Sequence, residues 1–192
     1  MTADRDLDER MARMGLGEWY SSLSDRDRVK IERYAGPELS PYAFLLSAGT
    51  AAIADENHPF ACLVLEACLP MSVTDMDTFT VTESLIDACI GAKRYDDAKQ
   101  LCENNLSLYP KVSVEIKERN GGRVPEKLCC RNRYVDIVVG IESGYDEAFR
   151  LLDRFLDMEL ISAEEHALRV QSLKIRRLQR SFDGVYTYTY KK

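Results

Sequence analysis

The chain has little proline and glycine, with six prolines and ten glycines among its 192 residues. So few turn-forming residues argue against a β-rich architecture built from many tight turns. No apolar run approaches the roughly 20 residues that span a bilayer, so no membrane helix is expected. Residues 1–13 mix acids and bases without an apolar stretch, so the sequence predicts no secretory signal. With 45% apolar and 30% charged residues, it is typical of a soluble globular protein.

Histidine is also scarce, which limits metal binding and acid–base chemistry. The two histidines are His58 and His166. His58 and Cys62 are four residues apart and would share one face of a helix, but a zinc site needs three or four ligands. The next cysteine, Cys68, would fall on another face. We therefore interpret His58 as a turn residue and predict no metal site.

Catalytic motifs are missing as well. The glycine pair Gly121-Gly122 lacks the Lys-Ser/Thr that follows the glycines of a phosphate-binding loop. The acidic pairs Asp96-Asp97, Asp146-Glu147 and Glu164-Glu165 stand where helices should begin, and acids there favour the helix dipole. The sequence thus predicts a protein without catalytic activity or a cofactor. A helical enzyme would require a buried polar pocket around one of the two histidines.

Six cysteines raise the question of disulfide bonds. They are Cys62, Cys68, Cys89, Cys102, Cys129 and Cys130. A chain of this length without a secretory signal favours a reducing compartment, so we expect free thiols and a cytoplasmic location. Most of these cysteines have apolar neighbours on expected helices, where a free cysteine behaves as a small hydrophobic residue. We therefore expect them in the core.

Apolar spacing and capping residues predict helices joined in pairs. The pairs are Ser40–Ala54 with Pro59–Leu69, Thr78–Ala92 with Tyr95–Leu108 (ended by Pro110), and 125–141 with 145–158. Residues 111–124 fit either a short strand or a frayed helix. We predict an N-terminal helical cap over 1–36, helical-hairpin repeats over 37–161, and a basic helix with an extended tail over 162–192.

A short pattern repeats fifty residues apart, as Tyr95-Asp96-Asp97-Ala98 and Tyr145-Asp146-Glu147-Ala148. With Leu85, Ala88, Leu106 and Pro110, the first copy resembles a tetratricopeptide repeat, and residues 135–160 are a looser match. The resemblance implies an all-α fold, a right-handed stack of antiparallel helix hairpins whose first helices line a peptide-binding groove. It places Glu83, Asp87, Arg133 and Tyr134 in that groove. The two acids favour a basic or mixed peptide.

The last predicted helix begins with the capping pattern Ser162-Ala163-Glu164-Glu165 and runs to about Phe182. Leu168, Ile175, Leu178 and Phe182 share one side of it, at spacings of seven, three and four residues. The simplest arrangement packs this apolar stripe on the domain and leaves the basic side in solvent. Residues 185–190 alternate Tyr and Thr after Val185, which predicts an extended tail.

Charge is distributed unevenly. Residues 163–192 hold seven bases and three acids, a net charge of +4. The whole chain has a net charge of −6, so the other residues together carry −10. The bases on the last helix form a candidate basic surface of Arg169, Lys174, Arg176, Arg177 and Arg180. An acidic protein surface or self-association is one interpretation of it, and phosphate contacts with a nucleic acid are another. The sequence favours a non-catalytic protein–protein interaction scaffold or adaptor, with a nucleic-acid-associated factor as the alternative.

Overall fold

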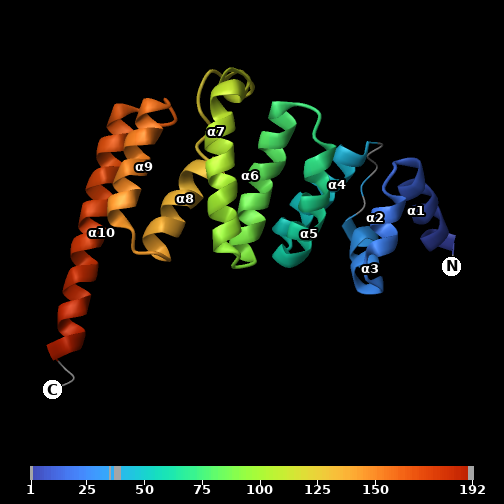
Figure 1. Ribbon diagram of the computed structural model, residues 1–192, viewed down its shortest axis with the longest axis horizontal. Coiled ribbons are helices and arrows are strands. Elements are labelled where there is room, and N and C mark those ends of the chain that lie inside the picture. Colours follow the sequence, from blue (N-terminus) through green and yellow to red (C-terminus); the bar gives the residue numbers. More distant parts are fainter. Residues whose placement is uncertain (1, 35, 37–39, 190–192) are drawn as a thin grey trace. The chain divides into compact units, whose positions relative to one another are not determined.

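The structure is a computed structural model that describes residues 2–34, 36 and 40–189 (Figure 1). Every regular element in these ranges is helical, which confirms the all-α prediction. The α-helices are α1 (Thr2–Arg13), α2 (Gly17–Ser22), α3 (Asp25–Tyr34), α4 (Pro41–Ala54), α5 (His58–Cys68), α6 (Asp75–Gly91), α7 (Tyr95–Arg119), α8 (Cys129–Gly140), α9 (Tyr145–Asp157) and α10 (Ala163–Thr189), and a 3-10 helix η1 (Leu69–Met71) follows α5. Most helices pack against neighbours in sequence, as in a helical stack. Within the described ranges, no helix is both long and apolar enough to cross a membrane.

The chain divides into two compact units, residues 1–115 and residues 116–192. The division falls inside α7, whose last residues belong to the second unit. The division predicted from the sequence, into 1–36, 37–161 and 162–192, separates the helical repeats from the segments before and after them. It is a different kind of division and stays a prediction.

Local capping signals explain where the central helices begin. The Ser40 hydroxyl accepts a hydrogen bond from the Ala43 amide at 3.2 Å, and Pro41 occupies the first turn of α4, as the sequence predicted. At α6 a capping box pairs Thr74 and Asp77, each side chain accepting the other's amide at 3.0 Å. Because of this box, α6 begins before the predicted Thr78.

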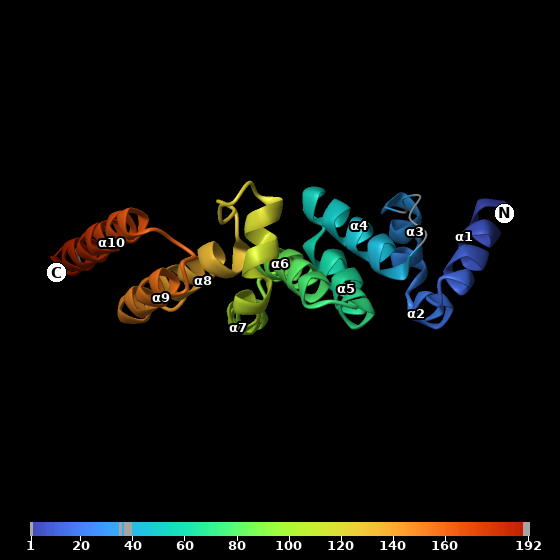
Figure 2. The same cartoon turned by 90° about the horizontal axis from the view of Figure 1, so that it is seen from above.

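The core of the first unit lies between α4, α5 and α6, which are neighbours in both views (Figures 1 and 2). Phe44, Phe60 and Ile86 contribute large buried side chains from the three helices. Gly49 lets α4 approach α5 closely: a Cβ added at Gly49 would lie 2.6 Å from Cδ2 of the fully buried Leu65. The backbone contact between these helices therefore depends on a residue without a side chain.

The N-terminal helices of the first unit bury their own apolar residues. Met11, Leu16 and Tyr20 are all nearly inaccessible to solvent. The Arg10 guanidinium donates a hydrogen bond to the Gly36 carbonyl, which connects α1 to the segment after α3. Tyr20 lies on the short helix α2. The sequence did not predict this helix, because six residues are too few to show a helical period.

Helix α7 corrects one prediction and settles an open one. We predicted that Pro110 ends the helix, but α7 continues to Arg119 with Pro110 inside it. Tyr109 and Val112 are buried and three residues apart, so the helical apolar face continues past the proline. Pro110 itself is exposed. Most of the segment 111–124 is therefore helix rather than strand, and the chain turns at Gly121 and Gly122, both with positive φ.

Replacing Pro110 with alanine should stabilise the protein by about 1 kcal/mol. Proline in a helix interior removes a backbone hydrogen bond and crowds the preceding turn, at a cost of about 3 kcal/mol, but it also restricts the unfolded chain. Urea unfolding followed by circular dichroism would measure the change. A loss of stability in Pro110→Ala would mean that the proline ring makes a favourable contact in the folded state.

The end of the chain also differs from the prediction. We expected an extended tail from Val185, but α10 continues as a helix to Thr189. Alternating Tyr and Thr favour a strand only where a partner strand can pair with them. A helix already formed over the preceding residues adds further hydrogen bonds without a new nucleation step.

Candidate functional site

Helix α10 starts at a side-chain cap and packs along α9 in the second unit. The Ser162 hydroxyl accepts a hydrogen bond from the Glu165 amide at 3.1 Å, as the capping pattern predicted. Leu173 is buried and only 4% exposed, and His166 Nε2 lies 2.9 Å from Asp153 Oδ1 on α9. Figure 1 shows α10 running beside α9 and continuing well beyond its end. The last turns of α10 thus project past the helix that it packs on.

The basic side of α10 faces the unit, which corrects the expected orientation of this helix. Arg169 pairs with Glu165 at 2.7 Å and donates to Asn132 Oδ1 on α8 at 3.1 Å. Arg177 pairs with Asp146 on α9 at 2.9 Å, and Arg180 donates to the Val139 carbonyl on α8 at 3.3 Å. Acids and carbonyl groups on α8 and α9 therefore attract the side of α10 that was expected in solvent.

The apolar stripe of α10 is consequently exposed. Leu168, Ile175 and Leu178 are 62%, 49% and 59% exposed, and together we call them the outer stripe. At about 100° per residue, these three positions lie on the opposite side of the helix from buried Leu173. Exposed apolar residues scattered singly are ordinary, but three on one face of one helix make a candidate docking surface. Phe182, which continues the spacing in sequence, lies outside the residues whose side chains are described.

Two of the five predicted basic residues are unpaired among the residues that the structure describes. Lys174 and Arg176 are exposed, and neither has a hydrogen bond or ion pair with any residue that the structure describes. The other three, Arg169, Arg177 and Arg180, are held by groups of the second unit. The candidate basic surface is therefore divided between three paired side chains and two unpaired ones.

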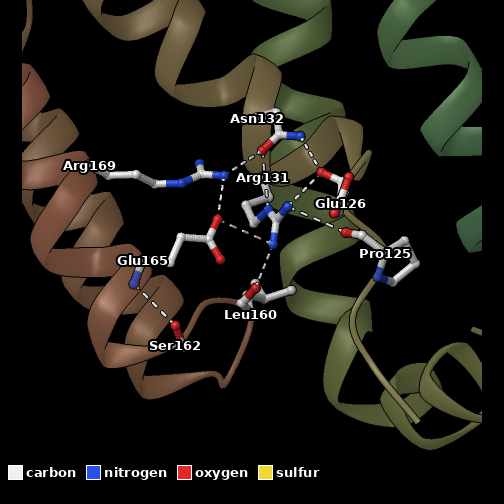
Figure 3. Close-up of polar contacts among 8 residues, drawn as sticks. All are labelled: Pro125, Glu126, Arg131, Asn132, Leu160, Ser162, Glu165 and Arg169. Carbon is white, nitrogen blue, oxygen red and sulfur yellow. Dashed lines mark hydrogen bonds and ion pairs between the residues drawn. The ribbon is translucent and has the colours of Figure 1, made fainter. Parts of the chain in front are cut away.

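Next to the start of α10, the buried side chain of Arg131 holds the second unit together (Figure 3). Only 4% of Arg131 is exposed. Its two terminal nitrogens donate to the carbonyls of Leu160 at 2.7 Å, Pro125 at 3.3 Å and Glu126 at 2.6 Å, and its Nε donates to Asn132 Oδ1 at 3.2 Å. Glu165 Oε1 lies 3.9 Å from the same guanidinium. A buried charge is tolerated when it is hydrogen-bonded in this way, so we interpret Arg131 as a structural clamp.

A cavity of about 810 Å³ opens beside this clamp. Its charged lining residues are Lys117, Arg123, Glu126, Arg131, Glu159, Glu165 and Arg169. Most of them are paired, since Lys117 contacts Glu159 at 2.9 Å and Arg169 contacts Glu165. Neither histidine lines this cavity. These ion pairs join most of the charged side chains around the cavity to one another.

The four predicted groove residues occupy two different units. Glu83 and Asp87 lie on α6 in the first unit, both half-buried, and Glu83 Oε1 accepts a hydrogen bond from Asn105 Nδ2 at 3.0 Å. Arg133 and Tyr134 lie on α8 in the second unit. Arg133 is exposed, whereas Tyr134 is buried, with 3% exposed, so little of its ring is left for a ligand. A common groove formed by these residues stays a prediction.

The cysteines are free, and five of the six are buried as expected. Cys62 on α5 and Cys89 on α6 lie with their sulfur atoms 3.8 Å apart. The hydrogen bond between these two thiols lowers the pKa of Cys62 and raises that of Cys89. Burial raises the pKa of Cys68 to about 12. Because these thiols are buried, and two of them are hydrogen-bonded to each other, we interpret them as core residues.

Sequence reasoning missed Arg131, because nothing local separates an arginine that will be buried from one that will be exposed. It did identify the members of the outer stripe, but it expected them to pack against the domain, whereas the structure exposes them. No family model, no curated protein and no solved structure matches this chain. Its function is therefore inferred from these surfaces alone.

Proposed function

We propose that this chain is a non-catalytic protein–protein interaction scaffold or adaptor of the helical-repeat type, and that it holds its partner on the outer stripe of α10. The observation that carries the proposal is the exposure of Leu168, Ile175 and Leu178 on one face of α10. Burying three such side chains against a partner is a substantial driving force for association.

We further propose that the hairpins α4–α5, α6–α7 and α8–α9 form a right-handed stack of the tetratricopeptide type. The resemblance of residues 85–110 to that repeat supports this arrangement, as does the packing between α4 and α5 and between α8 and α9. In that arrangement Glu83, Asp87 and Arg133 remain candidates for a second, groove-like surface. Paired charges in the cavity beside Arg131 favour a scaffold over an enzyme.

The contacts of the basic side chains favour a protein partner over a nucleic acid. Nucleic-acid binding needs several bases directed at phosphates, and each contact makes the affinity more sensitive to salt. Arg169, Arg177 and Arg180 instead contact α8 and α9 or pair within α10. Lys174 and Arg176 alone would make a small phosphate footprint.

Replacing the outer stripe with serine should abolish partner capture without unfolding the protein. The variant Leu168→Ser, Ile175→Ser, Leu178→Ser is compared with the full wild-type chain in affinity capture from native lysate, with nuclease and at low and high salt. Loss of the three apolar contacts should reduce recovery about 100-fold. The matched control replaces three exposed valines elsewhere, Val29, Val73 and Val114, with serine.

The two candidate functions give different outcomes in this experiment. A scaffold keeps its partner in the wild type and in the valine control after nuclease treatment and at high salt. Recovery that disappears with nuclease, and that depends on Lys174 and Arg176 instead of the outer stripe, would contradict the proposal and favour the nucleic-acid-associated factor. Circular dichroism of each variant checks that the helices are intact.

A further inference from the structure

We propose that Cys62 and Cys89 form a peroxide-reactive thiol pair in the first unit, and that its oxidation joins helices α5 and α6 by a disulfide bond. The outer stripe belongs to the second unit, so this inference does not depend on the proposed function. It combines the distance between the two sulfur atoms with a guanidinium that lies beside one of them.

The two thiols are placed to form one bond. Cys62 on α5 and Cys89 on α6 are 27 residues apart in sequence, yet their sulfur atoms are 3.8 Å apart. The sulfur atoms of a disulfide are about 2.05 Å apart, so the remaining approach is a small shift that two side chains can share. Helices α5 and α6 already pack on each other (Figures 1 and 2). A disulfide here would therefore need no rearrangement of the fold.

An arginine distinguishes Cys62 from Cys89. Arg94 lies between α6 and α7, where its guanidinium pairs with Glu66 on α5 at 2.6 Å and with Asp97 on α7 at 2.7 Å. The hydrogen bond with Cys89, then the charge of Arg94 and a hydrogen bond from it, lower the pKa of Cys62, although burial opposes them. Cys62 is therefore the thiol that ionises more readily, and the thiolate is the reactive form of cysteine.

The position of Arg94 also gives a small oxidant a way in. Cys62 and Cys89 are only 2% and 1% exposed, but Arg94, which is hydrogen-bonded to the Cys62 thiol, is itself exposed. The Cys62 sulfur thus lies one side chain beneath the surface. Exposed ion pairs are weak and exposed side chains change rotamer rapidly, so movement of Arg94 admits a molecule as small as hydrogen peroxide. A bulky oxidant such as oxidised glutathione would require the helices to separate.

The reaction has two steps. The Cys62 thiolate attacks one oxygen of hydrogen peroxide, the O–O bond breaks, and the departing hydroxide takes up a proton to become water. Cys62 is then a sulfenic acid. The Cys89 sulfur attacks the Cys62 sulfur, the S–S bond forms, the S–O bond breaks, and the hydroxyl leaves as water with the Cys89 proton. Two thiols are oxidised to one disulfide, and one peroxide is reduced to two waters.

The other cysteines provide internal comparisons. Cys68, also on α5, donates a hydrogen bond to the Tyr42 carbonyl at 3.5 Å, and burial raises its pKa to about 12, so it stays protonated at neutral pH. Cys129 in the second unit is half-buried, whereas the other five cysteines are buried. Accessibility alone therefore predicts that Cys129 reacts first, whereas the thiol pair predicts that Cys62 does.

The test treats the full wild-type chain with hydrogen peroxide under native conditions and then alkylates the remaining thiols. Cleavage after glutamate, lysine and arginine separates Cys62 in fragment 57–66, Cys68 in 67–83 and Cys89 in 84–93. Mass spectrometry should find 57–66 linked to 84–93, lighter by two hydrogen atoms than the two reduced fragments together. The same treatment in concentrated urea should lose this preference, because unfolding removes the geometry that brings the two thiols together.

Trapping of the intermediate identifies the attacking thiol. The variant Cys89→Ser keeps a hydroxyl donor beside Cys62 but cannot form the disulfide, so oxidation should stop at the sulfenic acid. Dimedone should then label Cys62 about tenfold more than Cys68. In Cys62→Ser, Cys89 should stay unlabelled. The matched control Cys68→Ser should still form the link between 57–66 and 84–93, and circular dichroism checks that each variant is folded.

Arg94 is a positioning residue in this reaction, because it acts through Cys62. Replacing it with glutamine in the Cys89→Ser background removes a positive charge and so raises the pKa of Cys62. The pH at which dimedone labelling is half-maximal should move upward, and labelling at neutral pH should fall about fivefold. The control Lys93→Gln removes the exposed neighbouring charge and should leave the pH profile unchanged.

Three results would overturn the inference. They are oxidation of Cys129 before Cys62, a link that involves Cys68, and the lack of any link between 57–66 and 84–93 under native conditions. Partner capture through the outer stripe is measured with a reducing agent present, which keeps the two questions separate. Failure of the disulfide then leaves the scaffold proposal standing, and failure of capture leaves the thiol pair standing.

Discussion

Replacing Arg131 with methionine should destabilise the second unit by about 4 kcal/mol. Methionine keeps much of the length and apolar stem of arginine but donates no hydrogen bonds. The carbonyls of Pro125, Glu126 and Leu160 would lose their donors, and Glu165 would lose a nearby positive charge. Leaving buried polar groups without partners is among the most costly effects of a single substitution.

Amide hydrogen exchange of α8 and α9 measures this effect in the unit concerned. We expect protection factors there to fall by about 1000-fold, as a loss of this size implies. The control is Arg150→Met on α9, which changes an exposed arginine and should alter stability by less than about 0.5 kcal/mol. Similar protection in both variants would mean that Arg131 is not the clamp that its contacts indicate.

Replacing Gly49 with alanine should destabilise the first unit by about 3 kcal/mol. The added Cβ would lie 2.6 Å from Cδ2 and Cγ of Leu65, closer than carbon atoms approach without repulsion. Leu65 is fully buried, so its side chain has no free volume to move into. Helices α4 and α5 would have to separate.

The matched control for this prediction is Gly140→Ala at the end of α8. A Cβ added there meets nothing within 4 Å, so alanine should be neutral or stabilise the helix by up to about 1 kcal/mol. Urea unfolding followed by circular dichroism and by the fluorescence of Trp19, which lies in the first unit, compares the two variants. Stabilisation in both would show that α4 and α5 tolerate a wider spacing.

The helical hairpins could be predicted from the sequence because their signals are local. Ser40 with Pro41, and Ser162 with Glu165, are cap patterns that act within one turn, and α4 and α10 begin at them. The prediction was wrong where a local signal was overruled. Pro110 is a helix stop in isolation, but burial of Tyr109 and Val112 continues the helix through it.

The candidate site shows the same division between local and tertiary information. The sequence determined that α10 has an apolar side, with Leu168, Ile175 and Leu178, and a basic side. It also determined the all-α class, because helical periods and caps are set by residues a few positions apart. These properties need no knowledge of the remaining chain.

Only the tertiary structure decided which side of α10 faces outward. Asp146 on α9 and the Val139 carbonyl on α8 attract Arg177 and Arg180, and Leu173 is buried against the unit. A helix with two competing faces orients by the groups that its neighbours present, and those groups are up to 41 residues away in sequence. The outer stripe, and with it the proposed docking surface, results from that choice. The burial of Arg131 has the same origin, since carbonyls from two separate segments meet at its guanidinium only in the folded unit.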